Sequence, residues 1–538
     1  MPSIMPNIMH SLLATLLTPL PSKLAPLGQY IATPRQCLIF AGIAMAVMAV
    51  ALAFYPQFPH SLSRDSFEYL EFHPHRSALY PAFLDIFGGD TLYNYQPKLT
   101  LIATTQTATF ILAMGFMLWG LATARLPLSV LVVFVLALVA NYDLHFYHQT
   151  LLTDSFGLSA IFFLIGTLAL WFHTRHYGWL ASAMLVATLA FGLRPSMVAM
   201  PIGVAIVGLF HLINTRHWRK TLSALVLPFI LVVGFEAGYY HAHHETRSQD
   251  LLQKHMFGRG ALVLAIHEEV GDDTRLKPFM ARLGEVFHYD RDRYWANGEI
   301  CAWLTLHAFY EEAVYNQVEY GRLSPPSFDW GVQVFRTYPL TTARVIAQHY
   351  LKFFCVGSIT LAKTPIIVNE IMHWHPHQPP SPTKRLLLQL IAWAFIALGV
   401  AFFISKIYYA YRWTKRGIAL IPNHWLGKIF SRWQAPPLTP TEALGSTCIM
   451  LAFGYNLFIS IFSVSIVRFL IISYPLIVLG ILLMVVVIMN EIKQRIQPPP
   501  PTPKPKPNYL KPLIKTIVIG GGSLWVLKKF GEYLDGKR

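Results

Sequence analysis

Charged residues are scarce in this chain. Asp, Glu, Lys and Arg together make up 13% of its 538 residues, whereas soluble domains carry about a quarter. Hydrophobic residues make up 54% and aromatic residues 14%. This balance excludes an ordinary soluble domain and a disordered chain, and it predicts several membrane-spanning segments.

Cysteines are also few. The four are Cys37, Cys301, Cys355 and Cys448, and no two of them have C-x-x-C spacing, so the chain has no zinc-ribbon pattern. Cys37 and Cys448 fall in or beside apolar segments, where cysteine serves as a packing residue. Cys301 and Cys355 fall in one long polar segment, and a disulfide between them is left open.

Acidic residues are the scarcer of the two charges: 27 Asp and Glu stand against 43 Lys and Arg, for a net charge of +16. The basic residues gather in short loops near Arg125 and Arg175, at 216–220 and 406–433, and in the tail beyond Asn490. Such loops indicate the cytoplasmic side of a membrane. A nucleic-acid partner would need a basic face on a recognisable module. None is present, so no nucleic-acid binding is expected.

Apolar runs long enough to cross a bilayer occur about ten times. They cover 37–55, 99–120, 127–141, 151–172, 178–193, 196–213, 221–239, 386–407, 443–463 and 469–490. Spans of this kind must be helical, because lipid cannot satisfy an open backbone. The sequence therefore predicts an all-α membrane protein of about ten transmembrane helices with an extracytoplasmic domain.

The same pattern divides the chain into five parts: a cytoplasmic or interfacial segment 1–36, a membrane module 37–239, an extracytoplasmic domain 240–385, a second membrane module 386–490 and a Pro/Lys-rich cytoplasmic tail 491–538. The first module contains an outer loop at 56–98, and the second contains the basic cytoplasmic loop 406–433. Within the extracytoplasmic domain, 339–362 is expected to be an interfacial helix. In the tail, the pattern at 513–530 favours a surface-lying segment over an eleventh span.

Two histidine tracts, 241–244 and 373–377, fall near predicted membrane boundaries. A metal site needs three or four converging ligands, and histidines at such boundaries are more often interfacial or structural. No cofactor is therefore assigned, and a divalent cation stays open.

The outer loop after the first span is unusually rich in charge for this chain. Within thirteen residues it contains Arg64, Asp65, Glu68, Glu71, His73, His75 and Arg76. Carboxylates beside a membrane are costly unless they are solvated, paired or functional. Such a cluster can hold a general base and a phosphate-binding cation in one cleft. A merely solvated loop is the plainer alternative.

The segments Arg64-Asp65-Ser66-Phe67-Glu68-Tyr69 and His75-Arg76-Ser77-Ala78-Leu79-Tyr80-Pro81 resemble the first outer loop of the GT-C membrane glycosyltransferases. That class includes the protein mannosyltransferases and aminoarabinose transferases. Its members often carry a D-S/E-x-x-Y element and then R-x-P-L-Y-P, and Ala78 stands where the family often has proline. The resemblance covers about 37–240 and 443–490. The 240–385 segment has no comparable signature.

Three further positions carry the resemblance. Asp154, in Leu-Thr-Asp-Ser, is similar to an acid in the family's second outer loop. Arg194, in Leu-Arg-Pro, and Arg468, in Arg-Phe-Leu before Tyr474-Pro475, are similar to arginines at outer turns. The plainer alternatives are a helix N-cap or first-turn acid for Asp154 and snorkelling to headgroups for each arginine.

The resemblance implies transfer of a sugar from a polyprenyl-phosphate donor to a lipid, polysaccharide or protein acceptor at the outer face. Asp65 is the expected base, and Glu68 would replace it or orient the site. Asp154 would orient the acceptor or bind a cation. Tyr69 and the arginines Arg76, Arg194 and Arg468 would bind the donor and its lipid phosphate.

Two other classes stay open. One is a non-catalytic membrane scaffold that binds lipids or glycans on the same frame. The other is an ion-coupled transporter that uses Asp65 and Asp154 as gates, although no inverted repeat supports it. The expected location is a bacterial inner membrane, with the site facing the periplasm.

Overall fold

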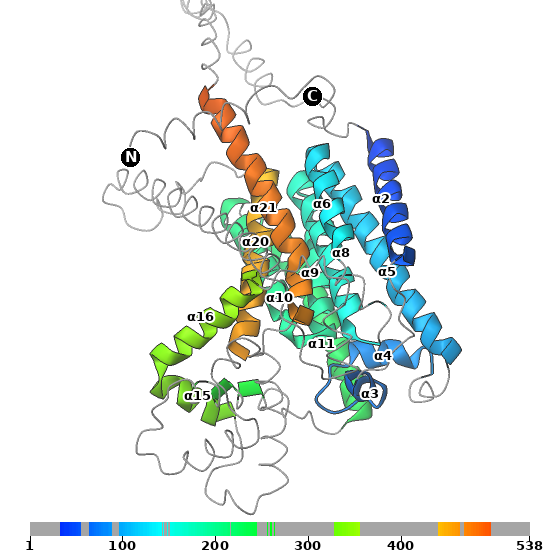
Figure 1. Ribbon diagram of the computed structural model, residues 1–538, viewed down its shortest axis with the longest axis vertical. Coiled ribbons are helices and arrows are strands. Elements are labelled where there is room, and N and C mark those ends of the chain that lie inside the picture. Colours follow the sequence, from blue (N-terminus) through cyan, green and yellow to red (C-terminus); the bar gives the residue numbers. More distant parts are fainter. Residues whose placement is uncertain are drawn as a thin grey trace, which may run out of the picture. The chain divides into compact units, whose positions relative to one another are not determined.

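The computed structural model describes residues 33–54, 64–88, 96–141, 144, 148, 151–215, 217–244, 255–256, 259–260, 263, 328–355, 439–462 and 467–496. This part of the chain is helical and contains no strand. Seven of its helices are long and apolar enough to cross a membrane, and two shorter helices are also apolar. The described part of the chain is therefore all-α (Figure 1), and its long apolar helices indicate a membrane protein.

The long helices are α2 (Pro34–Phe54), α5 (Gln96–Thr123), α8 (Thr153–Thr174), α11 (Trp218–His243), α20 (Pro440–Phe462) and α21 (Val467–Ile496), together with α10 (Ala199–Thr215), which follows the 3-10 turn η4 (Pro195–Val198). The shorter apolar helices are α6 (Leu128–Ala140) and α9 (Tyr177–Leu193). Each coincides with one of the ten predicted spans. The tenth, 386–407, lies outside the described residues, so the count of ten stays a prediction.

The starts of two spans are specified locally. Thr33 Oγ1 accepts the N–H of Gln36 at 3.2 Å, and Gln36 Oε1 accepts the N–H of Thr33 at 3.1 Å. This reciprocal capping box satisfies amides that a helix start leaves open, and Pro34 at the first helical position has no N–H that would need an acceptor. At α20, Thr439 Oγ1 likewise accepts the N–H of Glu442 at 3.2 Å.

Helix α8 is the centre of the bundle. In the most apolar stretch of α8, 89% of the residues are buried, whereas the corresponding value for α11 is 17%. It packs on α5, α9 and α20. A Cβ at Gly120 of α5 would lie only 2.8 Å from the carbonyl oxygen of Gly166 in α8. The two backbones approach this closely because neither residue has a side chain, which is how membrane helices gain packing contacts.

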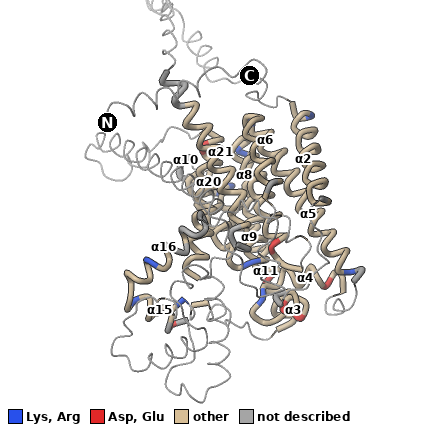
Figure 2. The backbone as a smooth tube through the Cα atoms, in the orientation of Figure 1, with Lys and Arg blue, Asp and Glu red and all other residues tan. Residues whose placement is uncertain are grey.

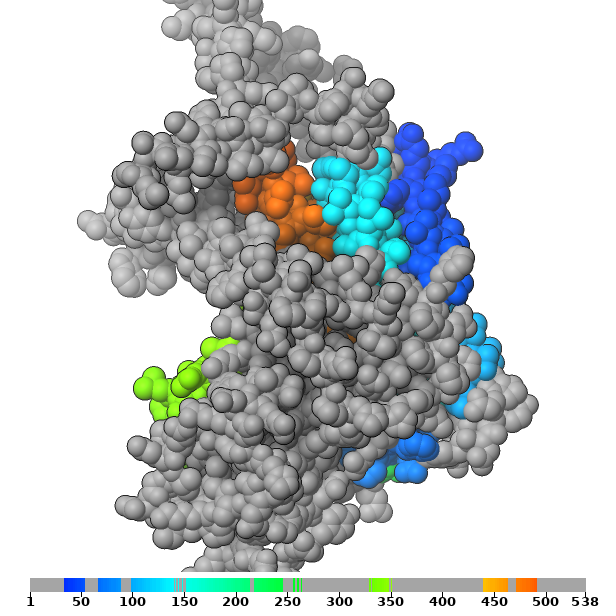
Figure 3. Space-filling model, viewed as in Figure 1, coloured from blue at the N-terminus to red at the C-terminus, as the bar shows by residue number. Residues whose placement is uncertain are grey.

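The remaining helices surround this centre. Helix α2 packs on α5, α11 packs on α9, and α10 packs on both α9 and α20. The outward faces of α2 and α11 expose large apolar side chains such as Leu38, Ile43, Leu227 and Leu231. Helices α2 and α21 also reach the surface in the space-filling view (Figure 3). Lipid is the natural solvent for such faces.

Part of the predicted extracytoplasmic domain is described. Helices α15 (Phe328–Thr337) and α16 (Pro339–Cys355) pack on each other, and α16 packs on α20. Tyr350 of α16 stacks on Phe453 of α20, with ring centroids 5.9 Å apart. Helix α16 occupies the first part of the predicted interfacial helix 339–362. The rest of that range, Cys301 and the side chain of Cys355 lie outside the described residues.

The chain divides into two compact units, Met1–Val485 and Val486–Arg538. Of the second unit only the end of α21, to Ile496, is described. The predicted surface segment 513–530 and the basic loop 406–433 lie outside the described residues. Cys37 and Cys448 are buried free thiols, which confirms their packing role.

Two short helices lie between α2 and α5. Helix α3 (Arg64–Leu70) and helix α4 (Leu79–Asp85) pack on each other, and α4 also packs on α9. Both lie at one end of the bundle, and acidic positions gather around them (Figures 1 and 2). The candidate site is at this end.

Candidate functional site

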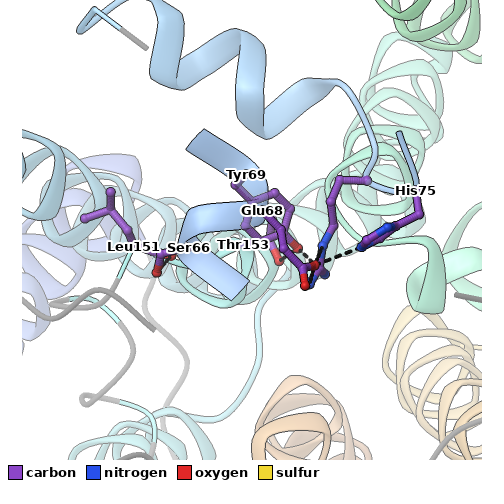
Figure 4. Close-up of polar contacts among 7 residues, drawn as sticks. Ser66, Glu68, Tyr69, His75, Leu151 and Thr153 are labelled. Atoms are coloured by element: carbon purple, nitrogen blue, oxygen red, sulfur yellow. Dashed lines mark hydrogen bonds and ion pairs between the residues drawn. The ribbon is translucent and has the colours of Figure 1, made fainter. Parts of the chain in front are cut away.

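The turn between α3 and α4 is built around Glu68. Its Oε2 accepts hydrogen bonds from Arg76 Nε at 2.7 Å, from Arg76 Nη2, and from His75 Nε2 at 2.8 Å (Figure 4). The loop therefore folds back so that His75 and Arg76, seven and eight residues after Glu68, both donate to its carboxylate. Charge-assisted bonds of this kind are the stronger class of hydrogen bond.

These contacts decide the ionisation of Glu68. Burial alone would raise its pKa, but the hydrogen bond from His75 and the charge of Arg76 outweigh burial and lower the pKa to about 2. Burial also lowers the pKa of the neighbouring His73, and the charge of His75 adds to this effect. A carboxylate with so low a pKa is a poor proton acceptor near neutral pH. Glu68 is therefore suited to holding Arg76 in place rather than to acting as a base.

Tyr69 connects this loop to the first turn of α8. Arg76 Nη1 donates to Tyr69 Oη at 3.3 Å, and the Arg76 guanidinium lies 4.7 Å from the centre of the Tyr69 ring. Tyr69 Oη in turn lies 3.3 Å from Thr153 Oγ1 (Figure 4). Ser66, three residues before Tyr69, donates through Oγ to the carbonyl of Leu151, two residues before Thr153, at 2.7 Å. Helix α3 is thus fixed to the start of α8.

Asp154, the next residue of α8, forms an ion pair with Arg194. The side chains are 2% and 8% exposed, so the pair is almost fully desolvated. Arg194 stands at the C-terminal end of α9, where its own N–H still bonds to Ala190. The pair therefore joins the start of one span to the end of the next.

This geometry bears on the plainer alternatives for both residues. The N-cap of α8 is Leu152 rather than Asp154, but Asp154 is a first-turn acid, as one of those alternatives expected, and its carboxylate is also paired with Arg194. Arg194 does not snorkel to headgroups, because it is 6% exposed and paired inside the bundle. Each charge is retained at depth because the other neutralises it.

Asp65 and Arg468 are located only by their backbones. Asp65 is the second residue of α3, directly before Ser66, which is hydrogen-bonded to Leu151. Arg468 is the second residue of α21. Their side chains lie outside the described part of the chain, so their roles stay predictions.

Glu236 also belongs to this end of the bundle, and the sequence analysis did not single it out. Its Oε1 accepts the backbone N–H of Ala78, just before α4, at 2.9 Å. Ser77, the preceding residue, donates to the carbonyl of Leu193 beside Arg194 at 3.2 Å. A carboxylate inside an apolar 26-residue helix is itself a functional signal, and that signal could have identified Glu236.

The first histidine tract is used for anchoring. His244 Nε2 bonds to the carbonyl of Phe72 at 2.6 Å, and His243 Nδ1 bonds to the carbonyl of Tyr239 at 2.8 Å. Tyr240 Oη donates to the carbonyl of Pro74 at 2.7 Å. The end of α11 is thereby attached to the α3–α4 turn. Among the described residues no group of three or more His, Cys, Asp or Glu could hold a metal ion.

A network of buried hydrogen bonds lies next to the site, and the sequence did not predict it. Tyr80 Oη donates to Gln106 Oε1 at 2.8 Å, Gln106 Nε2 donates to the carbonyl of His148 at 3.1 Å, and His148 Nδ1 lies 2.6 Å from Ser155 Oγ. Burial raises the pKa of Tyr80 well above its usual value, so its hydroxyl stays protonated. These hydrogen bonds hold α4, α5 and α8 together beside Asp154.

Comparison of the sequence with protein-family models and with curated proteins, and of the structure with solved structures, finds no match in any of the three.

Proposed function

We propose that this chain is a membrane glycosyltransferase that moves a sugar from a polyprenyl-phosphate donor to a lipid, polysaccharide or protein acceptor. The observation that carries the proposal is the joining of two charged elements at one end of the bundle. The Glu68–Arg76–Tyr69 network on α3 and its loop meets Thr153, directly beside the buried Asp154–Arg194 pair. These are the elements in which the sequence resembles GT-C enzymes.

The arginines suit the leaving group of such a reaction. Departure of a polyprenyl phosphate leaves negative charge on phosphate oxygens, and preorganised guanidinium groups stabilise charge of that kind. Glu68 holds Arg76 and Asp154 holds Arg194. Each arginine is therefore positioned before a ligand arrives, which is how electrostatic stabilisation becomes effective.

Asp65 is the proposed base. The acceptor hydroxyl attacks the anomeric carbon, its proton passes to the Asp65 carboxylate, and the bond between that carbon and the phosphate oxygen breaks. The phosphate leaves with the electron pair. A single displacement of this kind inverts the anomeric carbon. The low pKa of Glu68 supports this division of labour, with Asp65 as base and Glu68 as the group that orients Arg76.

The distribution of basic residues supports an outer-face site. Arg175 follows the far end of α8, and Arg219 and Lys220 stand in the first turn of α11, whose last turn contacts the α3–α4 turn. The basic ends of both helices are thus opposite the site. The positive-inside rule predicts that such ends are cytoplasmic, which supports our proposal that the site faces the periplasm across a bacterial inner membrane.

The proposal is tested by mass spectrometry of envelope glycans and lipids. Cells with the wild-type chain are compared with cells that have no copy and with cells that carry Asp154→Asn, at matched protein levels in the membrane. We expect one hexose or pentose increment to be missing in both altered strains. A deletion that leaves every glycan and lipid unchanged would contradict the proposal.

A further inference from the structure

A polar stripe lies on one face of the C-terminal half of α20, which is otherwise mainly apolar. Its members are Asn456 and Ser460, which are both completely buried. Ser460 Oγ donates to the carbonyl of Asn456 at 2.8 Å, and Arg259 donates to the carbonyl of the neighbouring Ile459 at 3.4 Å. The stripe is therefore a polar region within the hydrophobic bundle.

Among the described residues, the Asn456 carboxamide has no hydrogen-bond partner. Neither its oxygen nor its nitrogen forms a hydrogen bond in the structure described here. A buried amide without a partner is unfavourable, and the large majority of buried polar groups avoid this state. A ligand that forms hydrogen bonds with the Asn456 carboxamide would explain why this amide is buried.

The helix register shows which way Asn456 faces. A Cβ at Gly445 would lie 3.0 Å from the Cβ of Leu483 in α21, and a Cβ at Gly480 in α21 would lie 2.6 Å from Ile449 Cγ1. Asn456 follows Ile449 by seven residues, which is about two helical turns, so it shares this face. Seven residues back from Gly480 is Ser473, which is also completely buried.

This position is near the candidate site. A Cβ at Gly157 of α8 would lie 3.5 Å from Ile472 Cδ1 and 3.4 Å from Met197 Sδ. Gly157 is about one turn beyond Asp154, and Met197 is three residues after Arg194. The start of α8, the turn after α9 and the Ile472–Ser473 level of α21 therefore meet. Asn456 faces that level from α20.

We infer that Asn456 is a binding residue for a hydroxyl group of the ligand. A carboxamide offers one donor and one acceptor group without charge, which matches a sugar hydroxyl. The charged part of the ligand remains with the arginines. This inference rests on the proposed function and extends its site to α20.

The test uses Asn456→Leu, which replaces the carboxamide with an apolar side chain of similar size. The full-length protein is purified in a detergent with no sugar headgroup, and its unfolding temperature is compared with wild type. We expect the variant to unfold at a higher temperature, because an unpaired buried amide has been removed. In cells we expect the glycan increment per membrane-inserted molecule to fall by about tenfold or more, since a ligand hydroxyl then lacks its partner.

Ser446→Ala is the matched control. Ser446 lies on the same helix, and its hydroxyl is likewise buried without a partner in the structure described here, but it is ten residues from Asn456. We expect it to retain the increment. An Asn456→Leu protein that keeps the increment, or one that unfolds at a lower temperature than wild type, would overturn the inference. Loss of the proposed function itself appears separately, as a deletion strain with unchanged glycans.

Discussion

Asp154 and Arg194 are forty residues apart in the chain and form an ion pair inside the helical bundle. The pair connects the start of α8 to the end of α9 at the level where α3 contacts α8. Burying two charges is costly, and the pair is tolerated because each neutralises the other. Its position beside the Tyr69–Thr153 contact makes it the structural centre of the proposed site.

Removal of one member of this pair should be more damaging than removal of both. Asp154→Ala leaves a buried arginine without its counter-ion, and we expect a loss of about 3–5 kcal/mol in unfolding free energy. The double variant Asp154→Leu/Arg194→Met should recover most of this loss. Unfolding of the purified protein in detergent measures both.

The same double variant separates folding from function. It should remain at wild-type level in the membrane and still lose the glycan increment, because the phosphate-binding charge is gone. A double variant that is stable and retains the increment would show that the pair has only a structural role.

The Glu68 network should make stability depend on acidity. The pKa of Glu68 is lowered to about 2 from an ordinary value of 4.5, so its contribution is fully present above about pH 4.5. It should be lost progressively as the pH falls from that value towards 2. Unfolding temperatures of wild type and Glu68→Gln, measured from pH 7 to pH 3, should therefore differ at neutral pH and converge on acidification.

Arg76→Lys supplies the comparison for that experiment. It keeps the positive charge but loses the planar donor group. Its unfolding temperature at neutral pH should therefore lie between those of wild type and Glu68→Gln. A difference between wild type and Glu68→Gln that stays constant over the whole pH range would contradict the ion-pair account.

The α5–α8 contact requires glycine. In Gly120→Ala the new methyl group would lie 2.8 Å from the carbonyl oxygen of Gly166, so the backbones must separate. We expect a loss of about 1–3 kcal/mol, as for other overpacked cores. Thermal unfolding in detergent gives the value.

Gly42→Ala is the same substitution at an open position of α2, where nothing lies within 4 Å of the added Cβ. It should be neutral, or stabilising by up to about 1 kcal/mol through helix propensity. Equal destabilisation by Gly120→Ala and Gly42→Ala would show that the close approach of α5 and α8 is not the cause of the loss in stability.

Glu236 should protect the start of α4. Its carboxylate accepts the Ala78 N–H, so Glu236→Leu removes that acceptor, while Glu236→Gln keeps an oxygen in its place. Hydrogen exchange followed by mass spectrometry should show peptides over 72–80 exchanging about tenfold faster in Glu236→Leu, as expected for loss of a hydrogen bond to a charged group. Exchange that is equally fast in Glu236→Gln would assign the effect to the charge rather than to the bond.

The sequence predicted the apolar helices that the structure describes, because continuous apolar runs are a strong local signal, but it did not predict the short helices α3, α4 and α15. It also identified Glu68, Tyr69, Arg76, Asp154 and Arg194, since charges beside apolar segments are conspicuous. It did not predict the pairing of Asp154 with Arg194, the Glu68–Arg76 network or the contact of Tyr69 with Thr153. Those depend on how helices distant in the chain pack together, which no local pattern encodes.

Glu236 and Asn456 were missed for a different reason. Each lies inside a long, mainly apolar run, and hydropathy averaged over such a run conceals a few polar residues. The histidines at 243 and 244 show the converse, because a conspicuous cluster contacts backbone carbonyls.

The most direct test of the central proposal is the fate of the glycan increment in cells that carry Asp65→Asn. This substitution keeps the size of the side chain and removes the proposed base. Protein level in the membrane is measured in the same cells, and Asp85→Asn, in helix α4, is the control for loss of a carboxylate near the site. We predict that Asp65→Asn lacks the same increment as the deletion, while Asp85→Asn keeps it. An Asp65→Asn strain with the full increment would contradict the account.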